Sequence, residues 1–322
     1  DLSRPVGRPV GEGGAMAAQG DSMNISIDRR SLLVGALGAS LLATKPAVAD
    51  DYPTLTDIEL SDEEMLELFV KLRYSLDDRI TIGWVDAVNY AFIDGETFPL
   101  YRLLAATWYR TRADGPGRWK TTQLEIAMFL DMQTGELLDE LTMPVTGNTV
   151  DVPLYRSGPS EAEVVARFVR TRGFEMKRET RDGESSFMPG RAVSQGFLSQ
   201  PQRRGDDFFI RQDLNTRVYS GEGAKPGFFY REWTITKGSW AALSDPSLAM
   251  VVPNELAYSA NTAFRPWMNM GDMPGHTAQN GWGGRTDSFS GLPAELQRLA
   301  RQYQPDLVED PAAVLAGKRG ET

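Results

Sequence analysis

The fold is decided by the stretch ITIGWVDAVNYAFI, which covers residues 80–93. Its even positions carry large apolar side chains, with the single exception of Asp86. This period of two is typical of a β-strand whose two faces differ. The alternation is long for one strand, since about 5–6 residues is usual. Long strands occur in strongly curled sheets and barrels, so the stretch favours one of these.

Further extended segments follow on the C-terminal side, and most are separated by turn sequences such as Asp94-Gly95 and Asp182-Gly183. Residues 160–169 suit either a helix or a strand, and residues 239–258 predict a helix broken near Pro253. The expected strands are 100–112, 119–130, 137–141, 148–155, 174–180, 185–188, 206–219 and 228–236.

Two helices frame this β-rich region. Ser61 and Glu64 form a capping box before apolar residues at helical spacing, and Leu292–Tyr303 predicts a closing helix that Pro305 ends. We therefore expect a mainly β (α+β) fold, with a single large curled antiparallel sheet or a barrel-like domain framed by N- and C-terminal helices.

The N-terminal region predicts export. Arg29-Arg30 precedes the apolar segment 32–43 and the small-x-small sequence Ala47-Val48-Ala49. This pattern predicts a twin-arginine signal peptide over residues 23–49, recognised by the twin-arginine translocase through Arg29 and Arg30 and cleaved after Ala49. The apolar segment is shorter than the roughly 20 residues that cross a bilayer. We expect a periplasmic or secreted protein with no stable membrane anchor after cleavage; the alternatives are an uncleaved anchor and an ordinary buried helix.

The remaining domain boundaries follow from composition. Residues 1–22 are rich in Gly, Pro and Ala and are interpreted as a spurious upstream extension. Residues 50–312 are expected to form a single β-rich domain. Residues 313–322 are expected to be a disordered tail.

Composition excludes several chemistries. The net charge of -10 argues against a nucleic-acid partner, because phosphate binding needs a basic face. The chain has no cysteine, which excludes disulfides, thiolate metal sites and cysteine nucleophiles. His276 is the one histidine, so no centre with several histidine ligands can form. No Gly-rich phosphate loop follows a strand. We expect neither a metal nor a cofactor.

Residues 259–291 show little periodicity, and a long irregular segment is unusual in a compact domain unless it has a function. Large polarisable side chains there offer contact surface for a flat organic ligand. The ligand-binding candidates are Trp267, Met268, Met270 and Trp282, together with Trp84 and Tyr90 from the long strand. The alternative is that the segment only wraps the core.

The catalytic candidates are His276, Asp272, Arg265 and Asp86. An imidazole titrates near neutral pH, and a guanidinium offers a fixed fork for a carboxylate. Asp86 shares a face with apolar residues, so it is either buried with a partner or lines a cavity. Glu125 and Glu232 could point into a barrel, although a solvated strand face is the competing interpretation for both.

The chain resembles the bacterial domain-of-unknown-function family 1838, which consists of exported proteins. The resemblance spans Leu60 to Tyr303 and rests on the twin-arginine leader and three motifs. These motifs are the aromatic strand Trp84–Phe92 followed by Gly95, the strand and turn Phe129–Glu136, and Arg265–Gly271. The resemblance implies export and a β-rich fold, and it implies no activity or catalytic residue.

Three functions are compatible with these observations. The first is an enzyme independent of metal and nucleotide, using lyase, isomerase or hydrolase acid–base chemistry on a small aromatic or apolar organic compound. The second is a non-catalytic periplasmic protein that binds a small organic ligand. The third is a structural envelope protein.

Overall fold

The computed structural model describes residues 54–165, 173–180, 190–219 and 228–317. The predicted signal peptide and upstream extension lie outside these residues. The helices are α2 (Asp62–Arg73), α3 (Trp240–Ser244), α4 (Ala294–Tyr303), α5 (Pro305–Glu309) and α6 (Pro311–Leu315), with 3₁₀ turns η1 (Pro266–Met268) and η2 (Phe289–Gly291). The strands are β1 (Thr56–Asp57), β2 (Ile80–Ile93), β3 (Glu96–Ala113), β4 (Arg118–Leu130), β5 (Glu140–Thr142), β6 (Thr149–Asp151), β7 (Tyr155–Val165), β8 (Gly173–Thr180), β9 (Gly190–Leu198), β10 (Gln202–Arg204), β11 (Asp207–Tyr219), β12 (Phe228–Ser239), β13 (Asn254–Thr262) and β14 (His276–Thr286).

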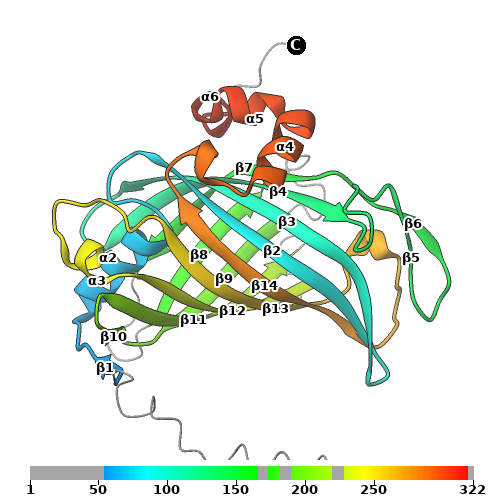
Figure 1. Cartoon of the computed structure of the whole chain (residues 1–322), viewed down its shortest axis with the longest axis horizontal. Helices are drawn as coiled ribbons and strands as arrows, with labels where there is room; N and C mark the ends of the chain where they lie inside the picture. The colour runs from blue at the N-terminus through cyan, green and yellow to red at the C-terminus, as the bar shows by residue number, and fades with distance from the viewer. Residues whose placement is uncertain (1–53, 166–172, 181–189, 220–227, 318–322) are drawn as a thin grey trace, which may run out of the picture. The chain divides into compact units, whose positions relative to one another are not determined.

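One strongly curled antiparallel sheet contains twelve of the described strands, in the order β1-β10-β11-β12-β13-β14-β2-β3-β4-β7-β8-β9 (Figure 1). β9 also pairs with β11, from Gln212↔Leu198 to Tyr219↔Arg191. The long strands β2, β3 and β4 are hairpin neighbours. The expected mainly β fold with a single large curled antiparallel sheet is confirmed; the C-terminal helices lie outside this sheet, whereas the N-terminal helix lies within its curl.

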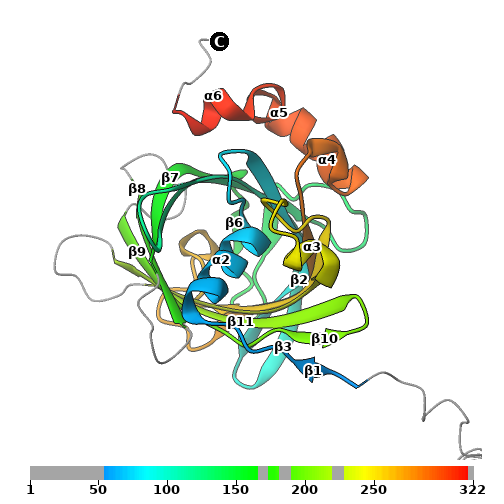
Figure 2. The same ribbon diagram turned by 90° about the vertical axis from the view of Figure 1, so that its left-hand side faces the viewer.

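Helix α2 packs against the inner face of the sheet. Ser61 and Glu64 cap its N-terminus as a capping box, as the sequence predicts. Its apolar face, which includes Phe69, packs against inward residues of β3, β7 and β11, including Tyr109 and Leu214. In the end-on view α2 lies among the strands that curve around it (Figure 2). Burial of this apolar face fixes the helix inside the curl.

Helices α4, α5 and α6 cover the outer face of β2, β3 and β4. Leu296 and Leu299 of α4 are buried against Trp108 of β3 and Ile126 of β4. The residues on either side of Trp108 and of Ile126 point to the inner face, so these two side chains lie on the outer face. Val314 and Leu315 of α6 belong to the same cluster. The expectation of a disordered tail from residue 313 is therefore wrong for 313–315, because these apolar side chains have an apolar surface to cover; residues 318–322 lie outside the described part.

The structure decides one segment that the sequence left open, and two other segments differ from the expectation. The described part of 160–169 is strand, because Ala162 and Val164 alternate into the core. The helix expected over 239–258 is limited to α3, and β13 begins at Asn254. The segment 259–291, expected to be irregular, contains the end of β13, the turn η1 and the whole of β14. Glycine and polar residues fill the inner face of β14, so no apolar alternation marks it as a strand.

Candidate functional site

Asp86 is held on the outer face of the sheet by Arg102. Both carboxylate oxygens accept hydrogen bonds of 2.8 Å from the Arg102 guanidinium. Arg102 also donates to Glu295 of α4 at 2.9 Å. These contacts raise the pKa of Arg102, chiefly through the hydrogen bond with Asp86. Asp86 therefore has a partner, and its contacts attach α4 to the sheet.

Most of the other candidates on β2 and β14 share this outer face. Trp282 is the cross-strand partner of Asp86 and is 62% exposed. His276 stacks on Phe92, with ring centroids 5.2 Å apart and planes at 4°. Trp84 packs under the outer helices and Tyr90 is half-buried on the same face. This group is separated by the sheet from the interior.

The loop between β13 and β14 divides in two. Asp272 is exposed. Met268 and Met270 are buried in an apolar cluster with Tyr101 and Phe129, and Trp267 packs against the same cluster. Burial raises the pKa of Tyr101 to about 12, although the nearby guanidinium of Arg265 opposes the shift. The structure thus brings Arg265, Trp267, Met268 and Met270 together and leaves the remaining candidates elsewhere.

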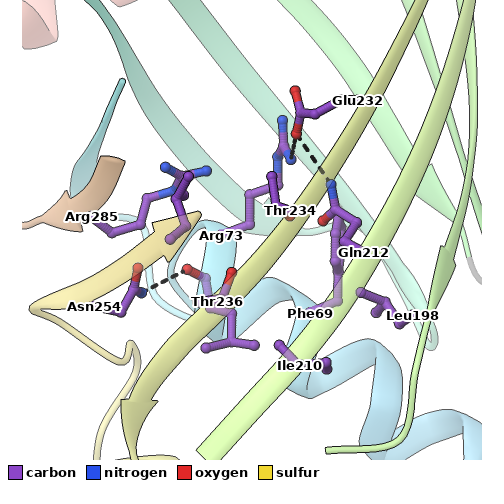
Figure 3. A pocket seen from close by; sticks show the side chains of 12 residues that line it. Phe69, Arg73, Leu198, Ile210, Gln212, Glu232, Thr234, Thr236, Asn254 and Arg285 are labelled. Carbon is purple, nitrogen blue, oxygen red and sulfur yellow. Dashed lines mark hydrogen bonds and ion pairs between the residues drawn. The ribbon is translucent and has the colours of Figure 1, made fainter. Parts of the chain in front are cut away.

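A cavity lies inside the curl, between α2 and the inner faces of β11 to β14 (Figure 3). It leaves about 20 Å³ for the centre of a water molecule, which is room for one or two waters or a group of similar size. Its lining residues are Phe69, Leu72, Arg73, Leu198, Ile210, Gln212, Glu232, Thr234, Thr236, Asn254, Leu256 and Arg285.

Arg285 is the most unusual member of this lining. It lies on the inner face of β14, opposite Gly83 of β2. Its guanidinium covers Gly83 so closely that a Cβ at residue 83 would lie 2.6 Å from Nη1. Nη1 donates to the carbonyl of Gly284 at 3.1 Å, but the buried Nε has no hydrogen-bond partner in the described part of the chain. A donor without a partner costs about 1–3 kcal/mol.

Arg73 and Glu232 form the charged pair of the cavity. Arg73 ends α2, and its Nη1 lies 3.7 Å from a carboxylate oxygen of Glu232. Glu232 also accepts hydrogen bonds from Gln212 at 3.4 Å and from the hydroxyl of Tyr230 at 2.9 Å. The inward orientation that the sequence left open for Glu232 is the one found.

A hydrogen-bonded chain of phenols continues from Glu232. The hydroxyl oxygens of Tyr230 and Tyr258 are 2.6 Å apart, and that of Tyr258 lies 2.8 Å from Oε1 of Gln279. Each phenol has one proton, so while Tyr230 donates to Glu232, Tyr258 donates either to Tyr230 or to Gln279. Burial is the main cause that raises the pKa of Tyr230 and of Tyr258, and the nearby Glu232 raises both further. Both phenols are therefore protonated at neutral pH.

The charges of the cavity lining do not cancel. Two arginines face one carboxylate, which leaves a net charge of +1 among the lining residues in a chain whose total charge is -10. Burial lowers the pKa of Arg285, and the positive charge of Arg73 lowers it further. An anion would relieve this repulsion, so the arrangement is suited to binding one.

The sequence analysis did not identify Arg73, Arg285, Gln212 or Asn254. Arg73 follows Phe69 by four residues and therefore lies on the apolar face of α2, so its inward orientation could have been predicted from this spacing. Arg285 continues the alternate series of Gly281 and Gly283 on β14, but that series gives no apolar pattern.

Two further observations concern the described residues. They include no group of three or more His, Asp or Glu side chains placed to hold a metal ion. No helix among them is both long and apolar enough to span a membrane.

Comparison with known proteins gives one match. Residues 226–319 match the model of a family described as "Protein of unknown function (DUF1838)". The matched range includes the Arg265–Gly271 motif, the loop that carries Trp267, and Arg285. The motifs at 84–95 and 129–136 precede it. No curated protein matches the chain.

Proposed function

We propose that this protein binds a small organic acid inside the curled sheet. The DUF1838 family, to which the chain is assigned, has no known function, so the proposal rests on the side chains of this chain. The carboxylate of the acid lies beside Arg285 and Arg73 in the interior cavity. Gln212 and the threonines of β12 supply further hydrogen-bonding groups. Because the cavity has room for the carboxylate group alone, the apolar part of a larger acid enters only as Phe69, Leu198 and Leu256 move apart around it.

The observation that carries this proposal is Arg285. A buried guanidinium with an unpartnered Nε and a second arginine nearby is a costly arrangement in a folded protein. A carboxylate matches it in charge, in planar shape and in hydrogen-bonding geometry. The size of the cavity also suits a carboxylate group.

An acid–base enzyme acting on the same ligand is the second candidate, and the chain of phenols favours it. Glu232 lines the cavity and accepts a hydrogen bond from Tyr230, which is itself bonded to Tyr258. This chain gives the cavity one carboxylate and two protonated phenols as groups that could accept or donate a proton. His276 and Asp86 are assigned no part in it.

The binding proposal is tested by calorimetric titration with benzoate, acetate and inorganic phosphate. Arg285→Met is expected to weaken carboxylate binding by roughly 10- to 100-fold, because a hydrogen bond to a charged group contributes about 1.5–3 kcal/mol. Arg110→Met removes the same charge from an exposed pair with Asp78 and is the matched control. Equal benzoate affinity in both variants contradicts the proposal. Mass spectrometry of the recovered benzoate separates binding from turnover.

We also propose that the protein is exported by the twin-arginine translocase to the periplasm or beyond. The support is the order of Arg29-Arg30, apolar segment and Ala47-Val48-Ala49. Replacing both arginines by lysine should keep the protein in the cytoplasm. A wild-type protein isolated from the periplasm should begin at Asp50. Export of the double-lysine variant at the normal level would overturn this assignment.

A further inference from the structure

A second group of buried polar atoms lies in the interior, next to Tyr230 and Tyr258. Asn89 of β2 and Gln279 of β14 are cross-strand partners on the inner face, and Tyr101 of β3 is the partner of Asn89 on its other side. Directly opposed residues of this kind have Cβ atoms about 4.5–5.5 Å apart. Asn89 and Gln279 are 0% and 1% exposed.

These side chains present hydrogen-bonding atoms that the described protein does not satisfy. Neither Nδ2 nor Oδ1 of Asn89 has a partner, and Nε2 of Gln279 has none. The Oε1 atom of Gln279 lies 2.8 Å from the hydroxyl of Tyr258, so Nε2 is the atom of this amide that has no contact of its own. Native proteins leave few buried polar atoms unpaired, and an amide that lacks every partner is the exception that requires a ligand or an ordered water.

Trp267 completes the group from the loop that contains η1. Its indole Nε1 is buried and also lacks a partner among the described residues. Its ring lies 6.2 Å from that of Tyr101 and 5.6 Å from that of Phe129. Because Tyr101 is the cross-strand partner of Asn89, the indole and the two amides belong to one region of the interior.

The chemistry of the free atoms defines what they would bind. Three are donors, on Asn89, Gln279 and Trp267, and one is the acceptor oxygen of Asn89. None of the three residues carries a charge, and the nearby Arg265 interacts favourably with the carboxylate of Glu125, so the region favours an uncharged group over an anion. A carboxamide is complementary, since its oxygen accepts two hydrogen bonds and its N–H donates one. The rings of Tyr101 and Phe129 supply apolar surface for the rest of such a molecule.

We propose that Asn89, Gln279 and Trp267 form a second binding site, which takes an uncharged carboxamide group. The carboxamide oxygen accepts two hydrogen bonds, one from Nδ2 of Asn89 and one from either Nε2 of Gln279 or the indole of Trp267, and its N–H donates to Oδ1 of Asn89. The site does not rest on the organic-acid function, because it uses none of the residues assigned to the carboxylate. A ligand that carries both groups would occupy both sites at once.

The test follows the indole N–H resonance of Trp267 by NMR, assigned with Trp267→Phe, during titration of the protein with acetamide. The resonance is expected to shift with a dissociation constant in the millimolar range, as befits so small a molecule. Acetone, which cannot donate a hydrogen bond, should bind more weakly. Asn89→Leu should weaken acetamide binding by roughly 10-fold. Asn280→Leu, at an exposed position of β14, is the matched control and should change nothing.

The outcomes separate this site from the first. Arg285→Met should leave the acetamide response unchanged, and sodium acetate should not shift the Trp267 resonance; either failure overturns the assignment. An absent acetamide shift, or one that persists in Asn89→Leu and Gln279→Leu, also overturns it and leaves the group as a site for ordered water only. A failure of acetate to bind anywhere removes the organic-acid function and leaves the carboxamide site standing.

Discussion

Replacing Gly83 by alanine should weaken organic-acid binding by moving Arg285 without removing its charge. Gly83 and Arg285 are cross-strand partners, and the guanidinium lies directly over the glycine. A Cβ at residue 83 would lie 2.6 Å from Nη1 and 2.7 Å from Cζ of Arg285. The guanidinium must therefore move by about 0.8 Å to reach the ordinary contact distance of 3.4 Å.

This displacement is large on the scale of the hydrogen bond at stake. Charge-assisted hydrogen bonds are about 2.7–2.9 Å long, so a shift of this size removes much of the roughly 1.5–3 kcal/mol that such a bond contributes. Affinity for benzoate should fall about 10-fold or more. The free energy of unfolding should change by less than about 1 kcal/mol. Alanine stabilises a strand by about 0.5–1 kcal/mol relative to glycine, and this gain offsets the strain of displacing the Arg285 side chain.

The assay is a double-mutant cycle measured by calorimetric titration with benzoate. Gly83→Ala and Arg285→Met should each weaken binding, and the double variant should bind no more weakly than Arg285→Met alone. The reasoning is refuted if Gly83→Ala binds benzoate as the wild type does. It is also refuted if the two losses add, because Gly83 would then act through something other than Arg285.

Three further predictions concern stability. The Asp77→Asn variant should be less stable than the wild type at neutral pH but not near pH 2. Hydrogen bonds from Arg79 and Ser75 lower the pKa of Asp77 from 3.8 to about 2. The ionised carboxylate therefore stabilises the folded protein above this range of pH, and this stabilisation is lost as the pH falls through it. Because Asp77 is well exposed, the loss should be about 1 kcal/mol or less, and urea unfolding from pH 6 to pH 2 that shows a constant difference would contradict the assignment. Leu296→Ala should cost about 2–5 kcal/mol in urea unfolding, since this fully buried side chain of α4 leaves a cavity; a cost below 1 kcal/mol would mean that α4 is not packed on the sheet. Arg102→Met should cost about 1 kcal/mol and more than Asp86→Asn, because it also breaks the pair with Glu295, and the double variant should be no less stable than Arg102→Met alone; additive losses would separate the two residues.

Elements with a clear apolar period could be predicted from the sequence. The alternation over 80–93 identified β2, and the capping box at Ser61 identified the start of α2. The closing helix was predicted from leucines at helical spacing, and α4 lies there. In each case one face carries apolar side chains that a neighbouring element covers; for β2 this is the outer face, where Ile82 and Trp84 pack with the C-terminal helices. Burial therefore leaves a periodic trace in the sequence.

The candidate site could not be predicted in the same way, because its residues lie on polar inner faces. β14 carries Thr277, Gln279, two glycines and Arg285 toward the interior, a pattern that gives no apolar period. The sequence located Trp267 and Arg265 in an unusual loop but grouped them with His276 and Trp282, which lie on the other face of the sheet. The pairing register of each strand decides which face of the sheet a side chain takes, and a shift of the register by one residue would exchange the two faces.

The central claim is that Arg285 receives a carboxylate inside the curled sheet. The most direct measurement is a crystal structure of the protein grown with 4-bromobenzoate, in which the anomalous signal of bromine locates the ligand. The account predicts a bromine peak inside the curl and a carboxylate oxygen about 2.7–2.9 Å from a nitrogen of Arg285. A cavity filled only by ordered water at a saturating concentration of the acid would contradict it.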